Sequence, residues 1–413
     1  MQLPSEIDVA VIGAGSAGVG AGRRLAAAKI NFVVLEARDR VGGRAWTKTV
    51  DGFPLDLGCG WLHSADHNPW TKIAEEEGLT IDRSPPPWGK PALQYGFSAA
   101  EQEEWRAEIA AFYERLNKAA ETQRDRPLSD FLEPGGKWNA WLNAISTYVN
   151  GVELDRASIG DYAAYEDSGV NWRVAEGYGT AITIAARALP VVFDCAVKTI
   201  DHGGRRLRIE TARGNLQART AVITVPSQLI AEEAIRFTPA LPEKLEAAGG
   251  LPLGLADKAF LHLADAEKFP PDSRLFGRIH PAGAATHQIR WQGRPLIESY
   301  FGGKLARELE NAGAGALGAF AVDDIVSLVG NDLRPRLRVL ATSSWSRDPF
   351  ARGSYSYALP GFESARAKLA APVDNRLFFG GEACSPHHFS TAHGGYEAGV
   401  TAAEQAIAAL AKR

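Results

Sequence analysis

The N-terminal part of the chain alternates short apolar runs with a glycine-rich turn. Residues 8–12 (DVAVI) are apolar and mostly β-branched, which is typical of a buried strand in a parallel sheet. Residues 13–18 (GAGSAG) predict a turn, and the Ala- and Arg-rich residues that follow favour a helix. A second apolar run, residues 31–35, ends at Glu36. The pattern therefore predicts the order strand, turn, helix, strand and acid.

The next part of the chain is predicted to be mainly helical. Asn68 and the proline after it indicate the start of a helix that ends at Gly78. Apolar residues then recur at helical spacing over residues 99–124 and predict an amphipathic helix. Residues 128–132 and 138–148 continue the helical pattern. The aromatic residues of this part are expected to form a core, and some of them to line a pocket.

The second half of the chain returns to mixed α/β character, with turns rich in glycine and proline between short apolar runs. The predicted helices are residues 181–189, 314–329 and 394–410. The predicted strands are residues 191–193, 196–200, 207–211, 215–218, 221–225, 258–263, 296–300 and 377–379, of which 207–211 with 215–218 form an antiparallel ribbon.

Composition narrows the class of protein. A hydrophobic content of 45% with 23% charged residues is that of an ordinary globular protein. The formal net charge of −4, without a basic stripe, argues against a nucleic-acid partner. Three widely spaced cysteines suggest a reducing compartment. With neither a leader nor a long apolar run, we expect a cytoplasmic protein that does not contact a membrane.

The glycine turn has the spacing of a dinucleotide site. Gly13 permits the tight turn, Gly15 lets the backbone approach a pyrophosphate, and Gly18 lets the helix pack close to the strand. The N-terminus of the helix supplies free N–H groups to the phosphates. Glu36 can accept hydrogen bonds from both ribose hydroxyls and would repel a 2′-phosphate. These features together predict that the chain binds a dinucleotide other than NADP.

The residues after Glu36 favour FAD over NAD. Residues 38–44 (RDRVGGR) bring a second glycine pair and an arginine, which suit a cofactor held in an extended form. Residues 56–63 (DLGCGWLH) follow. In these two stretches the chain resembles the flavin-dependent amine oxidases, which include the monoamine and polyamine oxidases and the soluble bacterial enzymes like them.

The resemblance implies an α/β fold with two domains, and 413 residues are too many for one compact core. One is a Rossmann-like FAD-binding domain, expected to be discontinuous over residues 1–66, 171–245 and 372–413. The other is an α+β substrate domain of antiparallel sheet and helices, expected over residues 67–170 and 246–371.

The resemblance also implies which residues bind FAD. Glu382 matches the family's glycine–glutamate pair near the ribityl chain, and the backbone near Val197 is expected at the adenine. Ser354 stands where some members carry the cysteine that bonds to FAD, so non-covalent binding is expected. The cofactor-binding residues predicted in this way are Gly13, Gly15, Ser16, Gly18, Glu36, Arg38, Gly43, Arg44, Gly58, Trp61, Val197, Trp345, Gly381, Glu382 and Ala392.

The predicted catalytic residues are Lys258, Tyr355 and Thr391. By pattern alone Lys258 is a solvent-facing residue on a strand, but the family places a lysine here, linked through water to flavin N5. Tyr355 matches one of two aromatic rings that flank the amine. Thr391 occupies the position of the other, so Trp345 or Phe389 could replace the missing ring. This departure leaves the substrate class open.

The expected reaction is amine oxidation by hydride transfer to the flavin, which gives an imine, while O2 becomes hydrogen peroxide. An amine dehydrogenase and an L-amino-acid oxidase, with Arg278 or Arg290 as the carboxylate clamp, are alternatives on the same scaffold. A lipid desaturase fits the composition less well, and a flavin-binding redox sensor is the alternative without turnover. No metal is expected, because adjacent His387 and His388 do not point at one ion. The oligomeric state stays open, with a homodimer as one option.

Overall fold

The computed structural model describes residues 1–121 and 124–412. Its larger sheet has eight strands in the order β11-β8-β9-β10-β1-β2-β7, with β17 paired to β10. The central strand β1 runs parallel to both β2 and β10, with Val9 opposite Phe32 on one side and Thr220 on the other. These strands are β1 (Glu6–Ile12), β2 (Phe32–Leu35), β7 (Val191–Val192), β8 (Val197–Asp201), β9 (Leu207–Thr211), β10 (Gly214–Ile223), β11 (Arg236–Thr238) and β17 (Leu377–Phe379).

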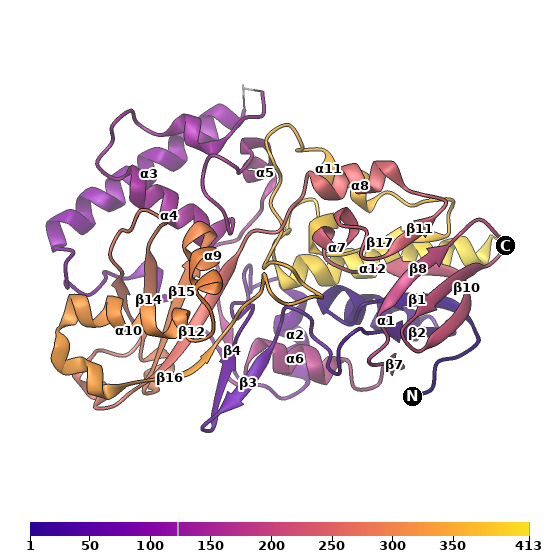
Figure 1. Cartoon of the computed structure of the whole chain (residues 1–413), viewed down its shortest axis with the longest axis horizontal. Helices are drawn as coiled ribbons and strands as arrows, with labels where there is room; N and C mark the ends of the chain where they lie inside the picture. The colour runs from indigo at the N-terminus through magenta and orange to yellow at the C-terminus, as the bar shows by residue number, and fades with distance from the viewer. Residues whose placement is uncertain (122–123, 413) are drawn as a thin grey trace.

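Helices cover both faces of this sheet (Figure 1). On one face, Val9 and Val11 pack with apolar residues of α1 (Ser16–Ala27) and α12 (Ala392–Ala411). On the other face, Ala10 and Ile12 belong to a core with residues of α7 (Ser227–Ala231), α8 (Pro242–Gly249) and α11 (Ala365–Ala370). The arrangement is a three-layer α/β fold, as expected from the N-terminal pattern.

Two glycines let α1 pack closely against its neighbours. A Cβ on Gly18 would lie 1.8 Å from the carbonyl oxygen of Gly13, and one on Gly399 would lie 1.9 Å from that of Ala17. Any side chain at Gly18 would push α1 off the turn, and any at Gly399 would push α12 off α1. Helices α1 and α12 can therefore pack closely because Gly399 has no side chain at their contact.

The second sheet has five antiparallel strands in the order β13-β14-β15-β12-β16. Side chains on one of its faces, such as Leu261 and Ile297, pack on α9 (Gly303–Ala312) and α10 (Ala316–Val329). The strands are β12 (Ala256–Leu263), β13 (Ser273–Phe276), β14 (Ala285–Ile289), β15 (Leu296–Gly302) and β16 (Leu337–Thr342).

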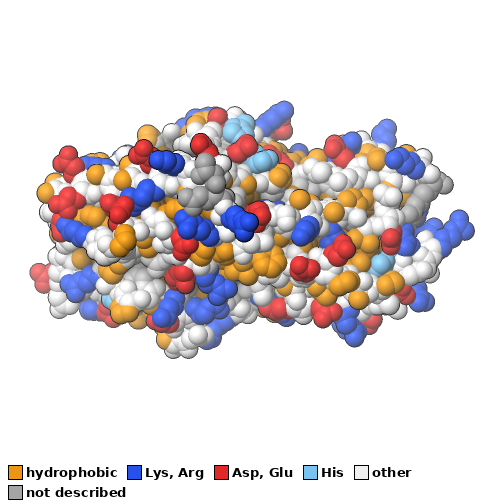
Figure 2. All heavy atoms as spheres, turned by 90° about the horizontal axis from the view of Figure 1, so that it is seen from above, with side chains coloured by type: hydrophobic (Ala, Val, Ile, Leu, Met, Phe, Trp, Pro, Cys, Tyr) orange, Lys and Arg blue, Asp and Glu red, His pale blue; other side chains and the backbone are white. Residues whose placement is uncertain are grey.

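The remaining elements surround the two sheets. In Figure 1, α3 and α4 lie above the second sheet, whereas α2 and α6 lie below the centre of the molecule. Figure 2 shows acidic and basic side chains interspersed over the face in view. These elements are α2 (Pro69–Glu76), α3 (Ala99–Ala120), α4 (Asn139–Val149), α5 (Ile159–Ala164) and α6 (Tyr178–Ala185), with the strand pairs β3 (Thr47–Val50) with β4 (Phe53–Asp56) and β5 (Ile81–Asp82) with β6 (Arg173–Val174).

Several boundaries differ from the sequence predictions. The predicted strands 215–218 and 221–225 are one strand, β10, because Thr220 between them stays extended and pairs with β1. The helix predicted over 128–132 is only a 3-10 turn, Leu128–Phe131, after the extended Pro127. The helix predicted over 99–124 ends as α3 at Ala120, and residues 122–123 lie outside the described part.

Helix α6 begins before the predicted residue 181. The Asp56 carboxylate accepts the Tyr178 N–H at 3.0 and 3.1 Å, which satisfies the first turn from a distant part of the chain. The helix ends at Ala185. A sequence pattern alone does not reveal a capping group so far away.

Membrane-spanning character was assessed for the helices of the described residues. None of them alone has the length and apolar composition to cross a membrane. Helices α9 and α10 reach the required length and apolar composition only when they are taken together, and the bend between them is 119°.

Candidate functional site

One cavity of about 1090 Å³ joins the two sheets. It extends from the glycine turn after β1 to the aromatic residues of α3 and α4. All the predicted site residues line it except Gly18, which packs beneath the turn. The predicted residues on its wall are Gly13, Gly15, Ser16, Glu36, Arg38, Gly43, Arg44, Gly58, Trp61, Val197, Lys258, Trp345, Tyr355, Gly381, Glu382, Thr391 and Ala392.

The glycine-turn end of the cavity suits a dinucleotide. No side chain caps the N-terminus of α1, so its free N–H groups are available to a ligand. A Cβ on Gly15 would meet only one atom within 4 Å, the carbonyl oxygen of Gly42 at 4.0 Å, so the backbone here is open to the cavity. The chain therefore fits a pyrophosphate at this point.

Glu36 is held in place by the backbone. Its Oε2 accepts the Ala14 N–H at 2.7 Å, and its Oε1 accepts the Arg38 N–H at 2.9 Å. Burial raises the pKa of Glu36, although these bonds and the Arg38 charge act against the rise. Each carboxylate oxygen keeps a second lone pair, so Glu36 can still accept two ribose hydroxyls.

Arg44 and Glu382 form the middle of the cavity wall. The Arg44 guanidinium donates to Glu382 Oε1 at 2.9 Å and to the Ser354 carbonyl at 2.7 Å. The other Glu382 oxygen accepts the Ser356 hydroxyl at 2.6 Å and the Ser390 N–H at 2.9 Å. Burial opposes ionisation of Glu382, but the Arg44 charge and the Ser356 hydrogen bond outweigh it and lower the pKa.

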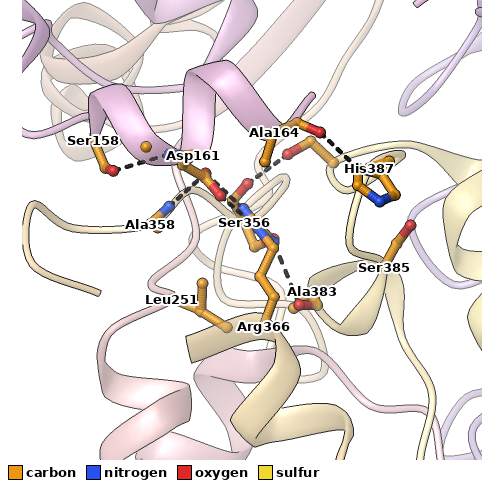
Figure 3. A network of polar contacts seen from close by, with 12 residues as sticks. Ser158, Asp161, Ala164, Leu251, Ser356, Ala358, Arg366, Ala383, Ser385 and His387 are labelled. Carbon is orange, nitrogen blue, oxygen red and sulfur yellow. Dashed lines mark hydrogen bonds and ion pairs between the residues drawn. The ribbon is translucent and has the colours of Figure 1, made fainter. Parts of the chain in front are cut away.

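A buried ion pair between Arg366 and Asp161 lies next to Ser356, the residue whose hydroxyl donates to Glu382 (Figure 3). Arg366 of α11 donates to both oxygens of Asp161 in α5, at 2.6 and 2.8 Å, and to the Ser356 hydroxyl at 2.9 Å. Asp161 also accepts the Ala358 N–H at 2.8 Å. The pair thus ties α5 and α11 to the loop that carries Tyr355, and fixes the hydroxyl that holds Glu382.

Lys258 is in the interior, with 5% of its surface exposed. Its Nζ lies 2.8 Å from Glu298 Oε1 and donates to the Asp56 carbonyl at 3.0 Å. The interpretation of Lys258 as a solvent-facing strand residue is therefore wrong. Burying an ammonium requires a counter-charge, and Glu298 on the neighbouring strand supplies it.

Glu298 also pairs with Arg173, a contact that the sequence analysis missed. Both Nη atoms of Arg173 donate to Glu298 Oε2, at 2.9 and 2.8 Å. Burial raises the pKa of Glu298, but the charges and hydrogen bonds of Arg173 and Lys258 overcome it and lower the pKa to about 2. Two aromatic rings contact the Arg173 guanidinium: its carbon lies 4.1 Å from the centre of the Trp61 ring and 4.7 Å from that of Trp291. A signal was present, because Glu298 interrupts the apolar run LIESYF.

Tyr300 lies opposite Lys258 on β15 and is one of three tyrosines in contact with one another. The Tyr355 hydroxyl donates to the Tyr148 carbonyl at 2.6 Å and lies 3.1 Å from the Tyr300 hydroxyl. Tyr148 and Tyr300 were not predicted as site residues, yet both line the cavity. Burial raises the pKa of Tyr300 and Tyr355, so both rings stay neutral.

The residues considered for the second aromatic ring have other partners. Thr391 is the N-cap of α12, where its hydroxyl accepts the Gly394 N–H at 3.0 Å and donates to the His388 carbonyl at 2.6 Å. Trp345 lines the cavity while its indole N–H donates to the Leu57 carbonyl at 3.0 Å. Phe389 also lines the cavity, with Arg366 stacked on its ring at 3.6 Å.

The proposed carboxylate clamps lie outside the cavity wall. Arg278 is exposed and donates to the Ser327 carbonyl at 2.6 Å, and Arg290 donates to the Phe269 carbonyl at 2.7 Å. Neither lines the cavity. Within residues 1–121 and 124–412, no group of three or more His, Cys, Asp or Glu side chains is arranged to hold a metal ion.

Comparison with known proteins identifies the class. The family model for flavin containing amine oxidoreductases matches residues 16–157 and 152–407. The chain therefore belongs to this family and is a flavin-dependent oxidoreductase that acts on amines.

Individual relatives are similar over nearly the whole chain. Probable polyamine oxidase 4 of Arabidopsis thaliana is 27% identical over 96% of this chain and 86% of that protein. Polyamine oxidase 3 of Oryza sativa subsp. japonica is 28% identical over 98% of this chain and 89% of that protein. The structure of a putrescine oxidase with bound putrescine superposes with a TM-score of 0.80 at 19% identity, covering 98% of this chain and 99% of that one. The last comparison shows a shared fold.

Proposed function

We propose that the protein binds FAD without a covalent bond and oxidises a neutral amine to an imine, with O2 as the electron acceptor. When bound, FAD accepts the hydride equivalent from the carbon next to the amine nitrogen and passes two electrons to O2, which takes up two protons and leaves as hydrogen peroxide. Water then hydrolyses the imine to a carbonyl compound and an amine or ammonia. The observation that carries the proposal is one cavity that joins the dinucleotide turn to the buried Lys258.

In this proposal the cofactor lies along the cavity wall. Glu36 binds the ribose, and the N-terminus of α1 binds the pyrophosphate. Arg44, held by Glu382, would bind the cofactor between these two points. Ser354 carries a hydroxyl, not a thiol, and therefore offers no sulfur for covalent attachment. This buried hydroxyl is hydrogen-bonded to the Ala256 backbone at 2.8 Å.

The residues around Lys258 select a neutral amine. Tyr300 and Tyr355 carry no charge, and Glu298, with its pKa lowered to about 2, is not a proton acceptor near neutral pH. The Lys258 ammonium disfavours a second cation next to it. The amine therefore enters without its extra proton, and the side chains orient it rather than remove a proton from it.

A panel of amines tests the proposal. Mixing the purified holoenzyme with each amine without oxygen should bleach the flavin absorbance for at least one of them, and admitting air should restore the colour and release peroxide. Bleaching without peroxide would identify a dehydrogenase with another acceptor. Absence of bleaching by every amine would contradict the proposal and favour a flavin-binding redox sensor.

A further inference from the structure

One face of the second sheet forms a wall of the cavity. Lys258 on β12, Glu298 and Tyr300 on β15, Gln288 on β14, and Arg274 and Phe276 on β13 all line it. Lys258 is opposite Tyr300, while Glu298 is opposite Gln288 and Gln288 is opposite Arg274. The wall therefore carries one cation near each end.

Arg274 differs from Lys258 because its charge has no partner. Among the residues that the structure describes, no hydrogen bond or ion pair involves its guanidinium, and the buried Nε lacks an acceptor. Its guanidinium carbon lies 4.0 Å from the centre of the Phe276 ring. Burial lowers the pKa of Arg274 to about 10, which leaves it charged near neutral pH. A cation in this position is unfavourable unless a ligand brings an anion to it.

The carboxylates on the described cavity wall already have ion-pair or hydrogen-bond partners. Glu298 neutralises Lys258 and Arg173, and Asp161 pairs with Arg366. The others in the described part are Glu36 and Glu382, bonded as above, and Asp167, which accepts the Gly169 N–H at 2.7 Å. The exposed Lys90 and Arg106, by contrast, add positive charge to the lining. In the described part of the lining, none of these carboxylates lies on β13 or β14, so a second ammonium at the Arg274 end of the sheet would find no carboxylate beside it.

The strand order and register set the spacing between the backbone positions of the two cationic residues. Arg274 lies three strands from Lys258 in the order β13-β14-β15-β12. Neighbouring strands are roughly 4.8 Å apart, so the two backbone positions are about 14 Å apart across the sheet. The register places Arg274 in line with Phe260, which adds an offset of two residues, about 7 Å, along the strand. This separation is too large for the carboxylate of an α-amino acid, whose amine and carboxylate share one carbon. The strands between them carry Gln288, Glu298 and Tyr300, while apolar rings of other elements, such as Phe97, Trp105 and Phe112, also line the cavity.

Building on the proposed amine oxidation, we propose that Arg274 binds a carboxylate at the far end of the substrate. The substrate is then an ω-amino carboxylate with a long apolar body, whose amine reaches the Lys258 end of the cavity. A guanidinium can hold a carboxylate through two parallel hydrogen bonds, which adds specificity as well as affinity. Diamines of the same length are disfavoured, because their second ammonium would approach Arg274.

Three series, each covering the same graded range of chain lengths, test this on the holoenzyme: n-alkylamines, α,ω-diamines and ω-amino carboxylates. The apparent Kd comes from the concentration dependence of anaerobic flavin bleaching. The wild type should bind the amino carboxylate about 10- to 100-fold more tightly than the alkylamine, and the diamine more weakly than either. Arg274→Gln should bring the first ratio close to one, and Arg274→Lys should retain part of it.

Arg278→Gln is the matched control, since Arg278 is exposed and outside the cavity, and it should keep the wild-type ratio. A wild type that prefers diamines, or an unchanged ratio in Arg274→Gln, would overturn the proposal. Calorimetry with an n-alkyl carboxylate, which has no amine, separates this outcome from failure of the proposed oxidation. If no amine bleaches the flavin, loss of that binding in Arg274→Gln still supports the carboxylate site, and its retention refutes the site.

Discussion

Lys258 and Glu298 form an ion pair in the interior, with Nζ and Oε1 2.8 Å apart on neighbouring strands. Because Arg173 binds the other oxygen of Glu298, the three side chains carry one net positive charge. The positive charge of Lys258 is thus held in one place at the cavity wall. A fixed charge of this kind stabilises charge that develops during a reaction without a cost of reorganisation.

Replacement of Lys258 by Met tests whether its charge assists oxygen. Lys258→Met keeps most of the stem, so we expect reoxidation by O2 to slow by about 10²–10³-fold, with a smaller effect on reduction by the amine. Stopped-flow measurement of both half-reactions checks this. The exposed Lys304, replaced by Met, serves as control. An unchanged oxygen rate in Lys258→Met would contradict the assignment.

Replacement of Glu298 by Gln should destabilise the fold. Glu298→Gln leaves Lys258 and Arg173 without their shared counter-charge, and breaking a buried pair in this way costs about 3–5 kcal/mol in the free energy of unfolding. Urea unfolding of the wild type and of Glu298→Gln measures this difference in the free energy of unfolding. Glu308→Gln removes an exposed partner, that of Lys304, and should change stability by less than about 0.5 kcal/mol. Equal effects of the two changes would show that the buried pair adds no stability.

Glu36→Ala should weaken flavin binding by at least about 100-fold. Two charge-assisted hydrogen bonds to the ribose would be lost, each worth about 1.5–3 kcal/mol. The Ala14 and Arg38 N–H groups would lose their acceptor as well. Flavin content after extensive dialysis is the measurement, with Glu404→Ala on the outer face of α12 as control. Full occupancy in Glu36→Ala would exclude Glu36 as the ribose ligand.

The flavin should leave the protein on acid or heat denaturation. Ser354 has no thiol to offer, and the buried Cys384 does not line the cavity. Cys59 and Cys195 do line it, but burial raises the pKa of both thiols and keeps them protonated. Burial raises the pKa of Cys384 to about 11, which keeps it as an unreactive thiol. After precipitation the yellow colour should be in the supernatant. Flavin that remains with the pellet would demonstrate a covalent bond.

His393 should make the protein less stable in mild acid. Burial, helped by the neighbouring histidines, lowers the pKa of His393 from 6.5 to about 3. Between these values the unfolded chain binds one more proton than the folded chain, so stability is complete above the upper value and falls as the pH decreases. At pH 5 the loss is about 2 kcal/mol.

Urea unfolding at pH 7 and pH 5 measures this loss. His393→Asn should reduce the difference between the free energies of unfolding at the two pH values, whereas replacement of the exposed His387 by Asn should leave this difference as in the wild type. The same pH dependence in His393→Asn and in the wild type would show that another group is responsible.

The local elements of the fold were predictable because their patterns are local. The strand, turn and helix of residues 6–27 and the position of Glu36 follow from apolar runs and glycines that are adjacent in sequence. That β10 is one continuous strand could not be predicted from sequence, because pairing with β1 keeps its middle extended. Helix α6 likewise depends on Asp56, which is remote in sequence.

The roles of the charged residues of the site also depend on residues that are remote in sequence. Lys258 could be proposed only from a resemblance, since a lysine in a strand is normally solvated. Its burial depends on Glu298 and Arg173, which three separate segments of chain bring together. Arg274 gives no signal in sequence at all. Its significance comes from the lack of an ion-pair partner among the described residues of the folded cavity wall, and this depends on the tertiary structure.

The contact between α1 and α12, made close by Gly399, has a consequence for biosynthesis. A ribosome that adds about 5–20 residues per second needs on the order of tens of seconds to pass from the first helix to the last. During that interval the nascent glycine turn lacks Glu382 and the final helix beside it. A chain whose translation stops before α12 would therefore carry the complete dinucleotide motif and still be unable to retain its flavin.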